Sequence, residues 1–299
     1  IYVPEFIESM KELADTGCVE FLSETYAHSL ASLEDPDEFV AQVKDHDKKI
    51  FQLFGKHPVV FRNTELIYDD DISAMVQNMG FKGVITEGAK HILGWKSPNY
   101  VYSSPVAPKL KLLLKNSKLS DDISFRFSNP DWASYPLTAD KYIDWIASLP
   151  EEEQLVNLFM NYETFGEMQP RESGIFEFMK ALPRFAVEKG IEFFTPSEVI
   201  SKMKSVGEMP VMHPISWADE ARDTSAWLGN TLQQEAVKKL YSIGERVRLC
   251  QDRRIKQDWY YLQASDHFFY MSTKHNEDGS VHSHYSPYDS PYTAFTNYM

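Results

Sequence analysis

The chain alternates short apolar segments, typical of β-strands, with segments of helical periodicity, and this alternation limits its possible folds most strongly. Residues 58–61 are β-branched or aromatic after a proline, which favours a buried strand. Three aspartates at 69–71 suit a helix N-terminus, and residues 72–79 carry apolar side chains at i, i+3, i+4 and i+7. Gly80 is placed to end that helix. A strand followed at once by a helix favours a parallel α/β architecture.

The same alternation continues through about residue 205, which favours a parallel sheet, most simply a barrel. Beyond that point the strand signals mostly disappear, and a long periodic helix is expected over 232–247. We therefore predict an α/β domain at 1–205 and a mainly helical domain at 206–299. Further strands are expected at 18–23, 81–86, 123–127, 155–160 and 191–194, and further helices at 6–13 and 175–189.

Composition excludes several partners. The 299 residues carry a formal net charge of −14, which argues against nucleic acid and against an anionic membrane surface. No apolar run approaches the roughly 18 residues of a membrane helix. Cys18 and Cys250 lack the spacing of metal ligands and form no disulfide framework, so we expect a reducing, cytoplasmic setting. The sequence does not indicate an oligomeric state.

Four glutamates fall at or just after the ends of expected strands: Glu24, Glu65, Glu87 and Glu163. A single glutamate of this kind is most often a solvated loop residue, but its repetition at the carboxyl ends of parallel strands favours a site. Carboxylates that converge on one rim suit glycoside hydrolysis, in which one carboxylate attacks the anomeric carbon and a carboxylic acid protonates the leaving oxygen.

Other chemistries have weaker signals. His and Glu side chains also bind Zn²⁺, but the histidines are scattered and no His-Glu-x-x-His run exists, so we expect no metal. No Gly-x-Ser-x-Gly elbow indicates a serine hydrolase. No glycine-rich phosphate loop is present, and we expect no cofactor. A third alternative is a metal-dependent polysaccharide deacetylase on a related barrel. It would lose its activity to a chelator, but the Asp/His ligand sets of such an enzyme are not evident in this sequence.

Residues 61–68, Phe-Arg-Asn-Thr-Glu-Leu-Ile-Tyr, resemble the nucleophile segment of glycoside hydrolase family 57, and most closely its bacterial α-amylase branch. The resemblance implies an incomplete (β/α)7 TIM-like barrel over 1–205, followed by a helical bundle domain over 206–299. It covers essentially the whole chain. Further segments that resemble family blocks are 20–30, 94–102, 161–167, 216–219 and 265–271.

By this resemblance Glu65 is the nucleophile of a retaining glycosidase that acts on α-1,4-glucans, as an α-amylase or a 4-α-glucanotransferase. It would form a glycosyl-enzyme intermediate that water or another sugar resolves. The resemblance also implies that His28, Trp217, Asp266 and His267 help to line the sugar subsites. Trp217 and His267 have a structural alternative, which is burial at the junction of barrel and bundle.

Two residues depart from the family pattern Asp-Tyr-Glu-Thr-Phe-Gly-Glu-His. Asn161 stands at the position of the family's acid/base aspartate, and Met168 stands in place of the histidine. An amide has no ionisable proton, so Asn161 cannot act as the acid. Glu163 is a poor substitute, because a two-residue step displaces its side chain by about 6.6 Å along a strand.

Activity is therefore expected to be impaired, and the alternative is a catalytically inactive protein that binds α-glucans. Asn161 is either an engineered change that traps substrate or a natural drift, and the second difference at Met168 favours drift. The family's first strand carries a His-Gln-Pro block that this sequence lacks. We accordingly expect the natural protein to extend before Ile1, and also beyond Met299.

Overall fold

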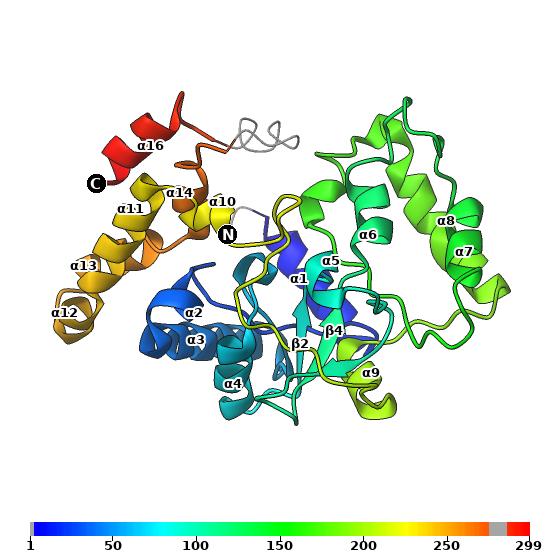
Figure 1. The fold of residues 1–299 in the computed structure, drawn as a ribbon, viewed down its shortest axis with the longest axis horizontal. Coiled ribbons are helices and arrows are strands. Elements are labelled where there is room, and N and C mark those ends of the chain that lie inside the picture. The colour runs from blue at the N-terminus through cyan, green and yellow to red at the C-terminus, as the bar shows by residue number, and fades with distance from the viewer. Residues whose placement is uncertain (1–2, 275–285) are drawn as a thin grey trace.

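The central element is a four-stranded sheet of order β1-β2-β4-β3 (Figure 1). In this computed structural model, which describes residues 3–274 and 286–299, β1 (Val60–Arg62), β2 (Gly83–Thr86) and β4 (Lys111–Leu114) are parallel. The short β3 (Tyr102–Ser103) runs antiparallel to β4. The predicted α/β class is therefore confirmed. The barrel and the helical bundle remain predictions.

The strands predicted from the sequence agree with the strands of the structure to different extents. Segments 58–61 and 81–86 overlap β1 and β2, as expected. From segment 18–23 only Ser23 pairs with the sheet, through a parallel bridge to Phe61. Segments 155–160 and 191–194 are not assigned to a strand. The strand β4 was not predicted at all, although its Lys-Leu-Leu-Leu sequence is a short apolar run.

The strand predicted at 123–127 is wrong. Helix α6 (Ser117–Ser124) occupies this region, and the Asn116 side chain caps it by accepting a 3.0 Å hydrogen bond from the Leu119 amide. Leu119 and Ile123, one helical turn apart, are both buried. The strand-like alternation arose because Phe127, beyond the end of the helix, turns into the same core.

The helices that follow the strands lie around the sheet, with α5 and α6 above β2 and β4 in the view of Figure 1. Because β1, β2 and β4 are parallel, the residues that follow them share one rim. Other elements before residue 205 are α1 (Pro4–Asp15), α2 (Ala31–Glu34), α3 (Pro36–Phe54), α4 (Asp70–Asn78), α5 (Lys90–Leu93), α7 (Ala139–Ala147), α8 (Ile175–Glu188), α9 (Pro196–Lys202) and the 3₁₀ turns η1 (Thr64–Leu66), η2 (Tyr162–Thr164) and η3 (Arg171–Ser173).

The regular elements in the described residues after 205 are helices. The helix expected at 232–247 is divided at Ile243, which is the C-cap of one helix and the N-cap of the next. The elements are α10 (Ser225–Leu228), α11 (Thr231–Ser242), α12 (Gly244–Leu249), α13 (Arg253–Tyr261), α14 (Ser265–Phe269) and α16 (Pro291–Tyr298). In the described residues, no helix is both long and apolar enough to cross a bilayer.

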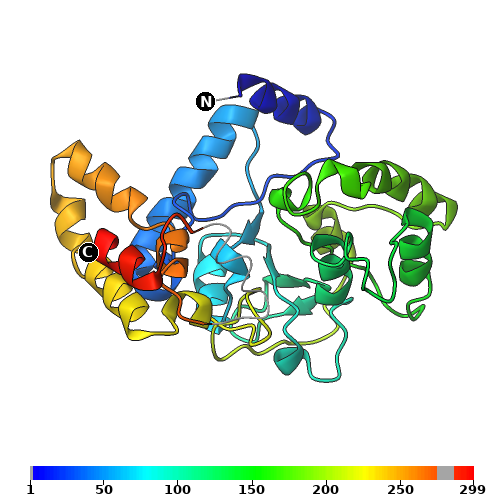
Figure 2. The same cartoon turned by 90° about the horizontal axis from the view of Figure 1, so that it is seen from above.

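Of three apolar clusters among the described residues, two lie on opposite sides of the sheet. The larger core joins the sheet to the C-terminal helices, and it contains Phe61 together with Trp227 and Phe268. A second core forms among α6, α7 and α8, around Tyr142 and Phe178. Figures 1 and 2 show α10–α14 and α16 gathered on one side of the sheet and α6–α8 on the other. The boundary at residue 205 stays a prediction.

Candidate active site

Glu65 lies just after β1 and has a left-handed backbone, with φ 56° and ψ 26°. Leu66 follows with φ 53°. Such values are costly for residues with a Cβ, and they persist only where surrounding contacts hold them. Here Thr64 shares a 2.6 Å hydrogen bond with Thr25, and Thr86 donates one of 3.3 Å to the Leu66 carbonyl. Contacts from Thr25 and from Thr86 of β2 therefore hold the turn that carries Glu65.

Three side chains from distant parts of the chain converge on the Glu65 carboxylate. His28 Nε2 lies 2.9 Å from Oε1, and Ser265 Oγ donates a 3.3 Å hydrogen bond to the same oxygen. The Trp217 indole Nε1–H donates to Oε2. The Glu65 side chain is only 16% exposed. This carboxylate is thus oriented by three polar groups and shielded from most of the solvent.

The charges at this centre stabilise each other. Burial alone raises the pKa of Glu65, but the hydrogen bond and charge of His28 outweigh it, with help from Trp217 and Arg62, and the net pKa is lowered. Burial opposes protonation of His28, whereas the Glu65 carboxylate raises its pKa above 6.5. Glu65 is accordingly an anion at neutral pH, which is the form that a nucleophile or an electrostatic stabiliser needs.

A loop at 215–223 holds Trp217 over Glu65. It is anchored by an antiparallel bridge between Tyr68 and Ile215, with backbone hydrogen bonds of 3.0 Å in both directions. The Trp217 amide donates a 3.3 Å hydrogen bond to the Glu65 carbonyl. Trp217 therefore contacts Glu65 through both its backbone and its indole, and burial at the junction is not its only contribution.

The other predicted rim carboxylates have different surroundings. Glu24 pairs with Arg62 at 3.1 Å and is part-buried. Glu163 is exposed in η2. Glu87 is fully buried, and burial raises its pKa although Lys115 lies 3.8 Å away. Glu87 accepts hydrogen bonds from the Ser117 hydroxyl and the Gly88 amide, but in the described part of the chain none of these three carboxylates is held by three side chains as Glu65 is.

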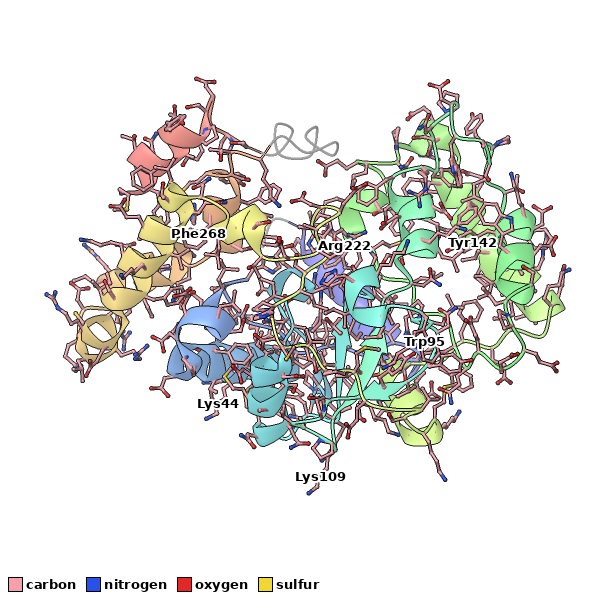
Figure 3. The ribbon with its side chains drawn as sticks, in the orientation of Figure 1. Lys44, Trp95, Lys109, Tyr142, Arg222 and Phe268 are labelled. Atoms are coloured by element: carbon pink, nitrogen blue, oxygen red, sulfur yellow. The ribbon has the colours of Figure 1, made fainter. Side chains whose placement is uncertain are left out.

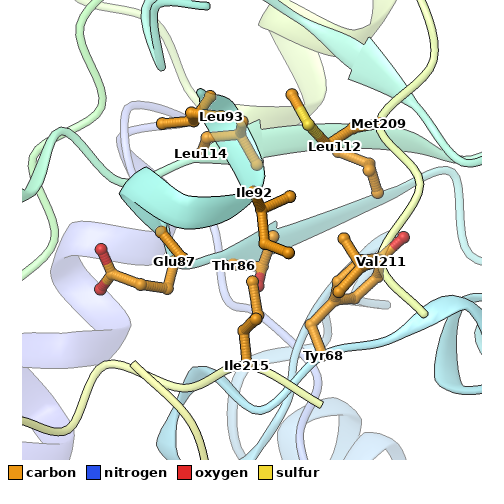
Figure 4. A pocket seen from close by; sticks show the side chains of 11 residues that line it. Tyr68, Thr86, Glu87, Ile92, Leu93, Leu112, Leu114, Met209, Val211 and Ile215 are labelled. Carbon is orange, nitrogen blue, oxygen red and sulfur yellow. The ribbon is translucent and has the colours of Figure 1, made fainter. Parts of the chain in front are cut away.

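A small cavity lies beneath the rim and is not a sugar site. Figure 4 shows its mainly apolar lining, with the Glu87 carboxylate directed away from Val211 and Leu112. Its volume is about 10 Å³, which is close to the minimum for one water molecule. Glu65 is not among the residues that line it.

Asn161 lies at the start of η2, where its side chain is exposed and its carbonyl accepts a 3.2 Å hydrogen bond from Thr164. The preceding segment runs beside the end of β4 and then along α6, since the Asn116 amide donates to the Asn157 carbonyl at 2.9 Å. The Phe159 amide donates to Ser120 Oγ at 3.1 Å. Among the described contacts, no hydrogen bond joins Asn161 to Glu65.

The structure brings together only part of the predicted site. His28 and Trp217 contact Glu65, but the predicted pair Asp266 and His267 does not. Asp266 is exposed, and His267 Nε2 lies 3.2 Å from the Tyr261 carbonyl. Their neighbour Ser265 contacts Glu65 instead, and it was missed. Ser265 is the first residue of the family-like block 265–271. The block therefore indicated the right segment, but the residues chosen within it were not the ones that contact Glu65.

No three His, Cys, Asp or Glu side chains in residues 3–274 and 286–299 are grouped closely enough to hold a metal ion.

Comparison with known protein families identifies the family of this chain. The sequence model of Glycosyl hydrolase family 57 matches residues 2–212. The chain belongs to glycosyl hydrolase family 57. The resemblance noted around Glu65 is thereby confirmed.

Relatives of this family-57 chain are longer than it is. A protein of Methanocaldococcus jannaschii named "Putative alpha-amylase" is 45% identical over 305 residues, and the match covers 98% of this chain and 64% of the relative. The chain thus spans less than two thirds of that relative's length.

Solved structures of the family have the same fold at low identity. The branching enzyme of Pyrococcus horikoshii matches with a TM-score of 0.73 at 15% identity, over 98% of this chain and 65% of that one. The 4-alpha-glucanotransferase of Thermococcus litoralis matches with a TM-score of 0.67 at 16% identity, over 89% of this chain and 46% of that one.

Proposed function

We propose that this chain carries the centre of a retaining glycosidase acting on α-1,4-glucans, with Glu65 as the nucleophile. The observation that carries the proposal is the Glu65 carboxylate, which is mostly shielded from solvent, anionic and held by His28, Trp217 and Ser265 at the rim of a parallel sheet. Membership of family 57 and the names of the relatives, an alpha-amylase, a branching enzyme and a 4-alpha-glucanotransferase, support the substrate class.

In the proposed reaction a Glu65 oxygen attacks the anomeric carbon, and the bond from that carbon to the glycosidic oxygen breaks. The leaving oxygen takes up a proton from an acid. Water (hydrolysis) or the hydroxyl of another sugar (transfer) then displaces Glu65, and the acid's conjugate base takes the incoming proton. His28 and Trp217 keep one Glu65 orientation throughout, because both donate to its carboxylate.

The proposal predicts that the first step of the reaction is slow because of the residue at position 161. Asn161 cannot supply the proton, so the first step lacks general-acid help, which typically contributes about 10²–10⁴-fold. The same observation favours the second candidate function, which is α-glucan binding without turnover. Asp266 and His267 remain proposed contributors to the subsites, further from Glu65 than Ser265 along α14.

The test compares the chain with its Asn161→Asp variant on maltoheptaose, with products separated by chromatography. We expect the variant to gain activity by about 10²–10⁴-fold. The matched control is Asn129→Asp, which adds the same charge at another exposed asparagine and should gain nothing. Newly formed reducing ends should have the α configuration, as a retaining reaction requires.

The nucleophile is tested in the activated background. Adding Glu65→Gln to Asn161→Asp should abolish turnover and any covalent glycosyl intermediate, whereas Glu163→Gln should retain the intermediate. Full turnover in the variant that carries Glu65→Gln would contradict the assignment. If Asn161→Asp and the parent both bind maltoheptaose by calorimetry and neither cleaves it, the binding function is the correct one.

A further inference from the structure

The loop at 215–223 is held from two sides by one arginine. Arg222 closes the loop through its own backbone, since its carbonyl accepts a 3.1 Å hydrogen bond from the Ser216 amide. One arm of its guanidinium, Nη1, donates to the Trp217 carbonyl. The other, Nη2, lies 3.2 Å from Asp121 Oδ2 on α6. Figure 3 shows Arg222 above the sheet, between the C-terminal helices and the helices α6–α8.

The ion pair is mostly shielded from solvent. The side chain of Arg222 is 21% exposed and that of Asp121 is 14% exposed. Lys115 is 6% exposed and donates a 3.0 Å hydrogen bond to the other Asp121 oxygen. Charge-assisted hydrogen bonds in such surroundings are stronger and more directional than exposed pairs, whose coupling is often negligible.

This contact connects two parts of the proposed site. Trp217 donates to Glu65 through both its amide and its indole, so a displacement of the Trp217 backbone displaces both donors. On the α6 side, Ser120 is next to Asp121 and holds the Phe159 amide, two residues before Asn161. The Arg222–Asp121 pair is therefore the link between the loop over Glu65 and the helix that supports the segment leading to position 161.

We propose that Arg222 is a positioning residue that keeps the Trp217 indole on the Glu65 carboxylate by tying the 215–223 loop to Asp121 of α6. The effect of Arg222 on catalysis rests on the proposed function, whereas its effect on the position of the Trp217 indole does not. A planar guanidinium serves both acceptors with separate N–H groups in a fixed fork. A lysine is a point charge on a flexible stem and cannot hold both acceptors in the same geometry.

The experiment observes the Trp217 indole directly by ¹H–¹⁵N NMR. The chain has six tryptophans, so six indole signals are expected, and Trp217→Phe identifies the one of interest. In Arg222→Lys we expect the Trp217 signal to shift and its N–H to exchange with water roughly tenfold faster, the factor that corresponds to about 1.4 kcal/mol. Asp121→Asn, which keeps the size of the side chain and removes its charge, should change the same signal in the same direction.

The matched control is Arg126→Lys. Arg126 follows α6 and pairs with Asp122 of that helix, with its Nε 2.7 Å from Asp122 Oδ1, but no described hydrogen bond or ion pair joins it to the Trp217 loop. This variant should leave the Trp217 signal and its exchange unchanged. If Arg222→Lys and Asp121→Asn both fold with an unaltered Trp217 signal, the coupling does not exist and the proposal is wrong.

A kinetic measurement distinguishes this proposal from the proposed function. In the Asn161→Asp background, Arg222→Lys should lower kcat by roughly tenfold with little change in KM, because orientation of the carboxylate affects the chemical step. If Asn161→Asp is inactive while Arg222→Lys still moves the Trp217 signal, the proposed function fails and the positioning role stands. If the kinetic loss is as large in Arg126→Lys, the effect is a general one of α6 and the proposal is overturned.

Discussion

The His28 imidazole and the Glu65 carboxylate stabilise each other's charged form at a distance of 2.9 Å, and both residues have a left-handed backbone. Neither φ value is one that a residue with a Cβ adopts at low cost, so the surrounding contacts must hold the pair in place. The charges that act on His28 besides Glu65 are Arg62, which lowers its pKa, and Glu24, which raises it. The pair therefore makes folding stability depend on pH.

We predict a pH-dependent cost for His28→Gln. The lowered pKa of Glu65 contributes stability above about 4.5 that is lost as the pH falls through the folded-state value. The raised pKa of His28 contributes stability below 6.5 that is lost as the pH rises through its folded-state value. Urea unfolding should consequently show the largest difference between parent and variant at pH 4.5–6.5. A difference that grew steadily toward alkaline pH would contradict the charge pairing.

At the scale of elements, α4 shows how a local signal determines a boundary next to the site. The Asp69 side chain accepts a 2.8 Å hydrogen bond from the Ile72 amide and so caps the helix that follows the Glu65 turn. We predict that Asp69→Ala lowers the free energy of unfolding by about 1 kcal/mol, because one amide of the first turn loses its acceptor. Denaturant unfolding followed by circular dichroism measures this.

Two variants serve as controls for the cap. Asp69→Asn keeps a capping oxygen and should remain within a few tenths of a kcal/mol of the parent. Asp71→Ala removes an exposed acid from the same turn and should cost less than Asp69→Ala. Equal losses from Asp69→Ala and Asp71→Ala would mean that charge near the helix end, and not the cap, is responsible.

At the scale of the whole molecule, a buried polar cluster joins the C-terminal helices to α3 and to the turn of His28. Gln42 Nε2 donates to Glu38 and to Gln263, at 2.9 Å each, and Gln263 Nε2 donates back to Glu38 at 3.0 Å. Gln42 Oε1 accepts from Ser29 at 2.9 Å. All four side chains are buried, so each group depends on the others for its hydrogen bonds.

We predict that Gln263→Ala destabilises the chain by about 1–3 kcal/mol, because one buried Gln42 N–H loses its acceptor and Glu38 loses one of its two amide donors. The loss should appear in one transition for both halves of the chain, since the sheet and the C-terminal helices share a core. Gln234→Ala is the control, because that glutamine bonds the Leu228 carbonyl at the surface. Separate transitions in the variant, with only the C-terminal one shifted, would instead support independent domains at 1–205 and 206–299.

Sequence alone determined the features that depend on neighbours along the chain. The β-branched run at 58–61 and the spacing over 72–79 predicted β1 and α4, because strand and helix periods are properties of a few consecutive residues. The block around Glu65 identified the family and the carboxylate on which His28 and Trp217 converge. The same local reasoning failed at 123–127, where α6 ends and the chain turns its next apolar side chain into the same core.

Only the tertiary structure decided which distant residues meet. Ser265 contacts Glu65 across 200 positions, and Arg222 reaches Asp121 across 101, so no local spacing relates either pair. The choice of Ser265 over its neighbours Asp266 and His267 depends on which face of α14 packs toward the turn of His28. Periodicity reports which side chains share a face, but it does not say what that face will contact, because contacts are made by folding of the whole chain.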